Sequence, residues 1–219
     1  MSAQNDLPSW WQPLLDRAAG IAPEELSRFL PPEEGGRESA VLILLGEHAP
    51  GEPDVLLIER AHDMRSHPRQ VAFPGGAVDD TDADVVAAAL REAQEETGLD
   101  PSGVRVVTTL PALYLPPSGY VVTPVIGWWE RPTPVSVVDP REVASVHRVP
   151  IAELVDPANR LRVSHPSGYV GAAFSVRGLL VWGFTAGLLE RLIRIAWWEQ
   201  PWDQDRVQDL PPEMIRAPR

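Results

Sequence analysis

The chain has 219 residues, a formal net charge of -12 and no cysteine. This length allows one well-buried domain with additions, and a hydrophobic share of 44% makes disorder along the whole chain unexpected. The negative charge argues against general attraction to nucleic acid or to anionic membranes. The absence of cysteine excludes a disulfide framework, a thiolate nucleophile and a cysteine-based zinc site.

The two ends of the chain differ in composition from the middle. Residues 1–38 form a predicted N-terminal appendage, either packed on the domain or loosely attached to it, with a short helix around Trp10 and Trp11. The main domain is predicted over residues 39–198, and residues 199–219 form a tail rich in Pro, Asp and Gln. The first residues lack the basic start and apolar core of a secretory signal, so a cytoplasmic location is expected.

Apolar runs and turn residues divide the middle of the chain into strands and helices. A paired set of strands is predicted at 39–45 and 54–60, followed by a basic loop and a helix from near Asp82 to Gly98. Later strands are predicted at 104–110, 120–129, 142–149 and 168–176, with helices at 151–155 and 184–196. Strands outnumber helices, which predicts an α+β fold, a mixed α/β/α sandwich with a central mixed sheet flanked by helices.

The helix that ends at Gly98 places several carboxylates together. At about 100° per residue, Glu92, Glu95 and Glu96 project to one side, beside an apolar stripe that can pack on a sheet. Crowded carboxylates destabilise a helix and raise one another's pKa values. Arg91 can pair with Glu95, but one guanidinium does not balance three carboxylates. A hard divalent cation such as Mg²⁺ does, although a solvated acidic helix face is a common alternative.

The same segment resembles the signature of the Nudix hydrolase family. The second half of that signature reads Arg-Glu-apolar-x-Glu-Glu-x-Gly-apolar, and the chain matches it from Arg91 to Leu99. A chance match has a probability of about 10⁻⁴ over the whole chain at average composition. The first half departs from the general pattern, because Asp82 stands where Glu is usual and eight residues, not seven, separate it from Arg91.

This longer spacing is similar to that of a Nudix branch that hydrolyses coenzyme A and its derivatives. That branch has an upstream motif, Leu-Leu-x-x-Arg-(Ser/Ala)-x3-Arg-x3-Gly-x3-Phe-Pro-Gly-Gly. The chain matches it at Leu56, Leu57, Arg60, Ala61, Arg65, Phe73, Pro74, Gly75 and Gly76. It has Arg69 where the motif has Gly, which weakens the substrate assignment more than the reaction type.

The resemblance implies roles for individual residues. Glu92, Glu95 and Glu96 are expected to hold Mg²⁺ or Mn²⁺, with Glu95 as ligand or base, while Arg91 orients Glu95. Glu142 is a further candidate base or ligand, against the alternative of an ordinary strand-end carboxylate. The expected substrate-binding residues are Arg60, Arg65, Arg69, Phe73, Gly75 and Gly76. The arginines, with His62 and His67, concentrate positive charge that suits a phosphate, although ordinary surface charge is the alternative.

The expected reaction is hydrolysis of the coenzyme A diphosphate to 3′,5′-ADP and 4′-phosphopantetheine, or its acyl form. The alternatives are a Nudix hydrolase for another nucleoside diphosphate derivative, such as ADP-ribose or a nucleoside triphosphate, and a catalytically silent Nudix-fold binding module. A small nucleotide is the expected partner, with no nucleic acid and no membrane. A homodimer is implied only by the resemblance.

Overall fold

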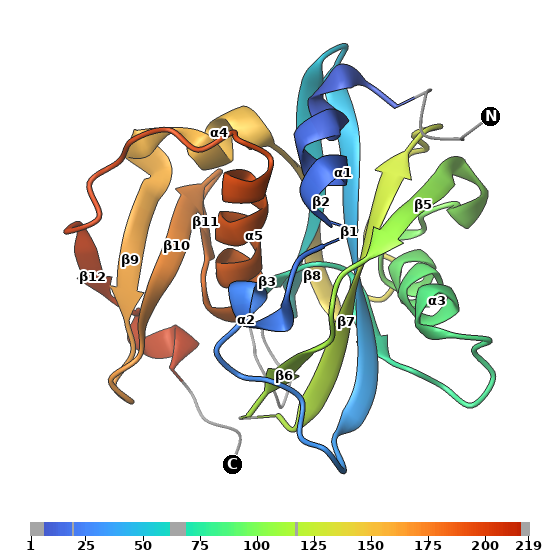
Figure 1. Ribbon diagram of the computed structural model, residues 1–219, viewed down its shortest axis with the longest axis horizontal. Coiled ribbons are helices and arrows are strands. Elements are labelled where there is room, and N and C mark those ends of the chain that lie inside the picture. Colours follow the sequence, from blue (N-terminus) through green and yellow to red (C-terminus); the bar gives the residue numbers. More distant parts are fainter. Residues whose placement is uncertain (1–6, 19, 62–68, 117, 216–219) are drawn as a thin grey trace.

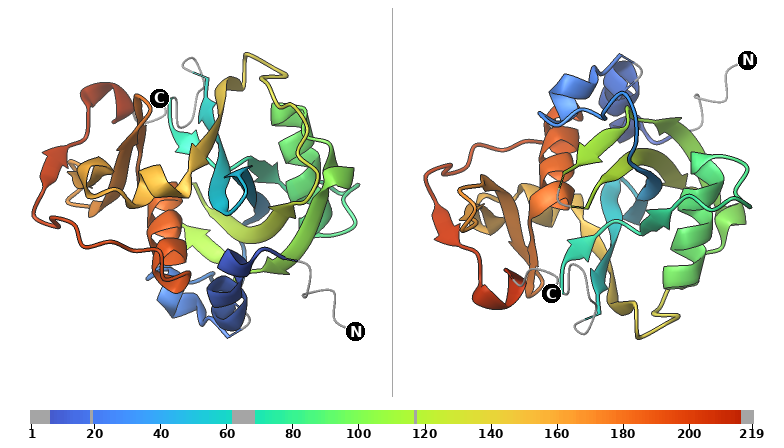
Figure 2. Two further views of the ribbon diagram at one scale, coloured as in Figure 1. Left: turned by 90° about the horizontal axis from the view of Figure 1, so that it is seen from above. Right: turned by 90° about the horizontal axis from the view of Figure 1, so that it is seen from below.

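The computed structural model describes residues 7–18, 20–61, 69–116 and 118–215. A central eight-stranded sheet, sheet A, carries helices on both faces, and a four-stranded sheet, sheet B, stands beside it (Figure 1). Figure 2 shows α5 between the two sheets. The α+β class predicted from the sequence is confirmed, whereas the second sheet was not predicted. No helix in these residues is long and apolar enough to cross a bilayer.

Sheet A is mixed because its central strand β1 has a parallel neighbour on one side and an antiparallel one on the other. β1 pairs in parallel with β7 from Arg37↔Tyr120 to Leu45↔Trp128, and in antiparallel with β2. The strands are β1 (Arg37–Ala49), β2 (Glu52–Arg60), β3 (Val71–Ala72), β4 (Gly75–Ala77), β5 (Val104–Thr109), β6 (Leu113–Leu115), β7 (Tyr120–Trp129) and β8 (Val143–Pro150).

The two faces of sheet A bury alternate residues of β1. Leu42 and Leu44 pack with the alanines of α3 (Val85–Thr97), whereas Ile43 and Leu45 belong to the core on the opposite face. That opposite core is covered by α1 (Gln12–Ala18), α2 (Pro23–Leu26), α4 (Ile151–Val155) and α5 (Gly183–Ile195). The alternation explains why the carboxylates of α3 lie against one face of the sheet.

Sheet B contributes to the core that contains α5 and to a separate, smaller core that includes Leu210. The strand order of sheet B is β11 (Leu179–Val181), β10 (Val170–Val176), β9 (Arg160–Ser164), β12 (Val207–Asp209). Trp11 near the N-terminus is fully buried in the core shared with α5. Near the C-terminus, β12 pairs in parallel with β9 and Leu210 is buried. Segments at both ends are therefore packed against the rest of the protein.

Candidate active site

The boundaries of α3 are set by Asp84 and Gly98, of which the sequence predicted Gly98. The Asp84 carboxylate caps the helix by accepting from the Val86 and Ala87 N–H groups at 2.9 and 2.8 Å. Gly98 ends it in the left-handed region with φ of 69°. The helix starts at Val85, three residues later than predicted, because Asp82 takes a different role.

Arg91 ties the start of α3 to the carboxylates further along it. Its Nε and Nη2 atoms donate to the two oxygens of Asp82, each at 2.9 Å. Its Nη1 donates to Glu92 at 2.8 Å and to Glu95 at 3.0 Å. The pKa of Arg91 is raised, first by Asp82 and then by Glu92. Arg91 therefore positions Glu92 as well as the predicted Glu95.

Asp82 also belongs to the site, although the sequence predicts it only as the start of the helix. Its two hydrogen bonds with Arg91 fix the orientation of the guanidinium. The Asp79 N–H in turn donates to Asp82 at 2.8 Å. The sequence feature that could have identified Asp82 as a site residue is its position as the acidic residue in the first half of the Nudix-like signature.

Glu96 is the most buried of the three candidate metal ligands. Its side chain accepts from the Gly75 N–H at 2.9 Å, and the residue is 5% exposed, in contrast to the 59% exposed side chain of Glu95. Burial raises the pKa of the Glu96 carboxyl to about 7, and the nearby charges of Glu92 and Glu142 act in the same direction. The Gly75 hydrogen bond and Arg60 oppose this rise. Burial likewise raises the pKa of Glu92, against the effect of Arg91.

Gly75 and Gly76 bring strand β4 onto these carboxylates. A Cβ on Gly75 would lie 2.3 Å from the Ala40 carbonyl oxygen, and a Cβ on Gly76 would lie 2.4 Å from the carboxyl carbon of Glu92. The absence of side chains is therefore required for β4 to contact both β1 and α3. Phe73, shortly before β4, is 2% exposed and packs in the core of the opposite face.

The structure places the other predicted site residues in different ways relative to Glu92 and Glu96. Glu142 immediately precedes β8, is exposed, and its charge acts on both Glu92 and Glu96. Arg60 ends β2, and its buried Nε has no hydrogen-bond partner among the residues described here. Arg69 is exposed with φ of 59°. Arg65, His62 and His67 lie outside the described residues.

The donor chemistry of the site fits a hard divalent cation. Its candidate ligands are carboxylate oxygens, and burial raises the pKa values of Glu92 and Glu96 despite the hydrogen bonds that each accepts, so a bound cation would favour their charged forms. Within the described part of the chain, no three acidic or histidine side chains converge in a metal-holding group. Glu92 and Glu95 are instead both hydrogen-bonded to Arg91.

Comparison with known proteins identifies the family. A model described as NUDIX domain matches residues 36–169. Proteins named "Uncharacterized Nudix hydrolase NudL" from Escherichia coli O7:K1 and Shigella boydii serotype 4 are 42% identical over 163 residues, covering 71% of this chain and 81% of theirs. A Nudix hydrolase from M. Smegmatis, RenU, shares the fold with a TM-score of 0.51 and 22% identity, over 75% of this chain and 89% of that chain. The chain belongs to the Nudix family, as a hydrolase acting on phosphoanhydrides.

Proposed function

We propose that this protein is a divalent-metal-dependent pyrophosphohydrolase that cleaves the diphosphate of coenzyme A or a derivative of it. The products are 3′,5′-ADP and 4′-phosphopantetheine, or the acyl form. The observation that carries the reaction type is the packing of Gly75 and Gly76 of β4 directly on Glu96 and Glu92. This packing brings the two halves of the family signature together.

The candidate ligands have different surroundings, which favours different roles. Glu92 and Glu96 are the proposed principal ligands of Mg²⁺ or Mn²⁺, because burial makes their uncompensated charge costly. A bound cation supplies compensation for the charge of the diphosphate and lowers the pKa of the attacking water. Arg91 positions Glu92 and Glu95 through its hydrogen bonds.

Two exposed carboxylates, those of Glu95 and Glu142, are the candidates for the general base. Glu95 or Glu142 takes a proton from the water that attacks phosphorus. The bond from phosphorus to the bridging oxygen then breaks, and the electron pair leaves on that oxygen. Two phosphate monoesters result, without a covalent intermediate on the protein. Glu95 also serves as a ligand if Glu142 is the base.

The basic residues favour a substrate rich in phosphate. Arg60 places a positive charge next to Glu96 and has a buried Nε without a partner among the described residues, which suits an anionic group of the substrate. Because the chain carries a net charge of -12, such local cations are needed to hold a phosphate-bearing ligand.

Arg69 bears on the choice of coenzyme A. It stands where the coenzyme A-type motif has Gly, and its φ of 59° is the left-handed conformation that favours glycine. The backbone conformation that a glycine accommodates is therefore kept despite the substitution. This supports the coenzyme A assignment and gives Arg69 a proposed role as an additional phosphate contact.

The second candidate is a Nudix hydrolase for another nucleoside diphosphate derivative. Its support is the same exposed Arg69, because an added cation at the end of this loop can also select a differently placed phosphate. A catalytically silent binding module is disfavoured because Glu92, Glu95 and Glu96 are all present.

Purified protein incubated with coenzyme A, ADP-ribose and nucleoside triphosphates, with and without Mg²⁺, tests the proposal when products are read by mass. Release of 3′,5′-ADP from coenzyme A alone, dependent on metal and lost in Glu96→Gln, is expected. Glu33→Gln, an exposed carboxylate far along the chain from α3, is the matched control and keeps activity. Turnover of another compound instead supports the second candidate, and no turnover of any compound overturns both.

A further inference from the structure

A tight turn directly before β8 carries Glu142, the candidate base or ligand that comes from outside α3. The Asp139 carbonyl accepts from the Glu142 and Val143 N–H groups, each at 3.0 Å. The Asp139 carboxylate accepts from the Arg141 N–H at 2.9 Å. Because Pro140 has no N–H, Asp139 binds every N–H group between itself and the first residue of β8, that residue included.

The chain before this turn is fixed to the end of α3. The Ser136 N–H donates to the Thr97 carbonyl at 2.9 Å. The Val138 N–H donates to the Glu96 carbonyl at 3.4 Å. The last carbonyls of a helix have no partner within the helix, so this segment completes the helix end. The turn is therefore connected to the same helix that carries the candidate metal ligands.

The chain after the turn is fixed to β2. The Ala61 N–H donates to the Glu142 carbonyl at 2.9 Å. The register of β8 against β2 shifts between Val143 and Ser145, directly after the turn. Such irregularities in a strand redirect side chains and are frequent next to active sites. Since the chain is anchored on both sides, the turn itself sets the direction of Glu142.

The position of Glu142 is electrostatically unfavourable without a bound cation. Its charge raises the pKa values of both Glu92 and Glu96, so it lies close enough to repel both carboxylates. On a free loop, an exposed carboxylate would move away from this repulsion. The fixed turn prevents that movement and keeps Glu142 where a cation or an attacking water can meet it.

The same Asp-Pro arrangement occurs at two other turns of the chain. In each, the aspartate carboxylate accepts from the N–H two residues later, at 2.9 Å for Asp100 and 2.8 Å for Asp156. These turns precede β5 and β9. The third residue after the aspartate is uncharged in both, whereas the turn at Asp139 places Glu142 there. The two other turns are therefore structural references, with the same side-chain bond but no acidic residue to position.

We propose that Asp139 is a positioning residue that holds Glu142 beside Glu92 and Glu96 for the reaction. This inference rests on the proposed function, in which Glu142 acts as base or metal ligand. Asp139 acts through the turn and not by contact with the substrate. A misplacement of about 1 Å can lower a rate by about 100-fold. Loss of one of the three hydrogen bonds that Asp139 accepts from the turn is expected to have a smaller effect of the same kind.

A double-mutant cycle on the compound that the protein hydrolyses tests the inference by steady-state kinetics. Asp139→Ala is expected to lower kcat by about tenfold with little change in KM, and Glu142→Gln by about 100-fold. The double variant is expected to match Glu142→Gln, because Asp139 acts only through Glu142. Asp139→Asn keeps an oxygen that accepts from the Arg141 N–H, so it is expected to restore most of kcat.

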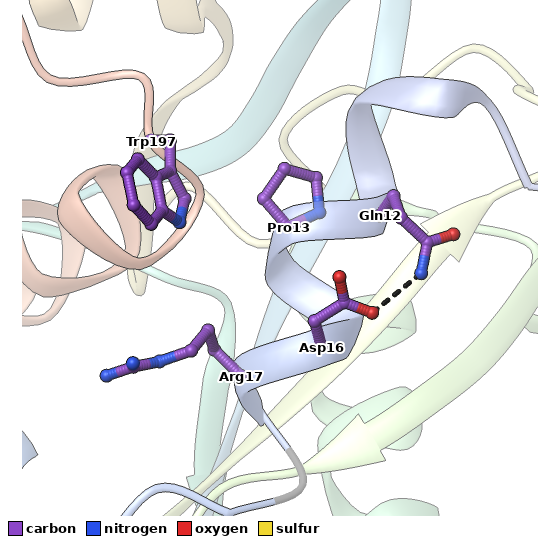
Figure 3. A pocket seen from close by; sticks show the side chains of 5 residues that line it. All are labelled: Gln12, Pro13, Asp16, Arg17 and Trp197. Carbon is purple, nitrogen blue, oxygen red and sulfur yellow. Dashed lines mark hydrogen bonds between the residues drawn. The ribbon is translucent and has the colours of Figure 1, made fainter.

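Two control variants separate positioning from stability and from charge. Asp156→Ala removes the same bond from the turn before β9, so it should lower stability to a similar extent and leave kcat unchanged. Asp16→Ala removes one negative charge on the opposite face of sheet A from α3. There Asp16 accepts from the Gln12 side chain at 2.7 Å, beside a hollow that Trp197 also lines (Figure 3). This variant should also leave kcat unchanged.

Hydrogen–deuterium exchange of residues 140–145 in the metal-free protein tests the turn independently of turnover. Exchange is expected to be faster in Asp139→Ala than in wild type, and unchanged there in Asp156→Ala. Additive losses of kcat in the double variant, or a Glu142→Gln variant with full activity, would overturn the inference and leave the reaction type standing. Unchanged exchange in Asp139→Ala would overturn it as well. Failure of every compound to turn over would instead overturn the proposed function itself.

Discussion

Charged side chains gather beside both long helices, with an excess of carboxylates beside α3 and equal numbers of arginines and glutamates beside α5. The α3 cluster consists of Arg91 with the four carboxylates of Asp82, Glu92, Glu95 and Glu96. The α5 cluster pairs two arginines with two glutamates. Arg160 lies 3.5 Å from Glu190 and 3.9 Å from Glu199, and Arg194 contacts the same two carboxylates at 3.5 and 3.3 Å.

The two clusters also differ in which charge is buried. Arg160 is fully buried next to the rings of Phe174 and Trp202, at 4.8 and 4.6 Å. Burial lowers the pKa of its guanidinium, the charges of Glu190 and Glu199 oppose this, and its Nε and Nη1 have no hydrogen-bond partner among the described residues. In the α3 cluster the buried group is the Glu96 carboxylate, whose charged neighbours are mostly also negative. Both clusters bury a charge, but only the α3 cluster has an excess of one sign, which favours a cation from outside the chain.

Neutralising Glu96 gives the sharpest contrast between the clusters. Glu96→Gln is expected to lower kcat by about 10³-fold if it is a ligand or acts on the attacking water. Without metal, the Glu96→Gln variant should be no less stable than the wild type, because the amide lacks the charge that burial disfavours. Steady-state kinetics and thermal melting in a chelator measure the two effects. A variant that fails to fold would contradict the interpretation of an uncompensated charge.

Truncating Arg160 should have the reverse outcome. Arg160→Ala leaves a cavity between two rings and removes the cation that Glu190 and Glu199 share, which is expected to cost about 3 kcal/mol of unfolding free energy. Arg160→Met keeps the volume and should lose less. Urea denaturation measures the loss, while activity per folded molecule stays at the wild-type level. A large drop in that activity would link the α5 cluster to the site.

The pH dependence of stability separates the clusters without changing the fold. The pKa of Glu96 is about 7 in the folded protein against an ordinary 4.5, so the contribution of this one group to stability is fully present below 4.5 and is lost as pH rises toward 7. The unfolded state ionises over this range while the folded state holds its proton. The metal-free wild type should lose about 2 to 3 kcal/mol relative to Glu96→Gln. Parallel stability curves for the two proteins would refute this.

Removing a charge of α3 that lies outside the α3 cluster gives the smallest effect. Asp84→Ala deletes the carboxylate that caps the helix and is expected to lower stability by about 1 kcal/mol. Activity at saturating metal should be retained, since Asp84 contacts only backbone N–H groups in the described structure. Denaturant unfolding alongside turnover measures both. A loss of activity comparable with that of Glu96→Gln would show that the α3 cluster extends to the cap.

The sequence by itself determined much of α3 and its chemistry. Gly98 predicted the end of the helix, and its start was predicted near Asp82, three residues early, because capping depends on local backbone geometry. The spacing of Glu92, Glu95 and Glu96 predicted a shared acidic side, and the match to the Nudix signature predicted the family. The longer strands were also predicted, since β1 and β2 are buried on both faces of sheet A and this leaves continuous apolar runs in the sequence.

Only the tertiary structure decided which residues of the same type are buried and which are exposed. Glu95 and Glu96 are neighbours of one type, yet Gly75 of β4 lies on Glu96 and leaves Glu95 largely exposed. Helical period fixes the direction of a side chain, but its burial depends on what packs there from elsewhere in the chain. The same reason applies to Asp82, whose contact with Arg91 depends on the conformation of the loop before α3.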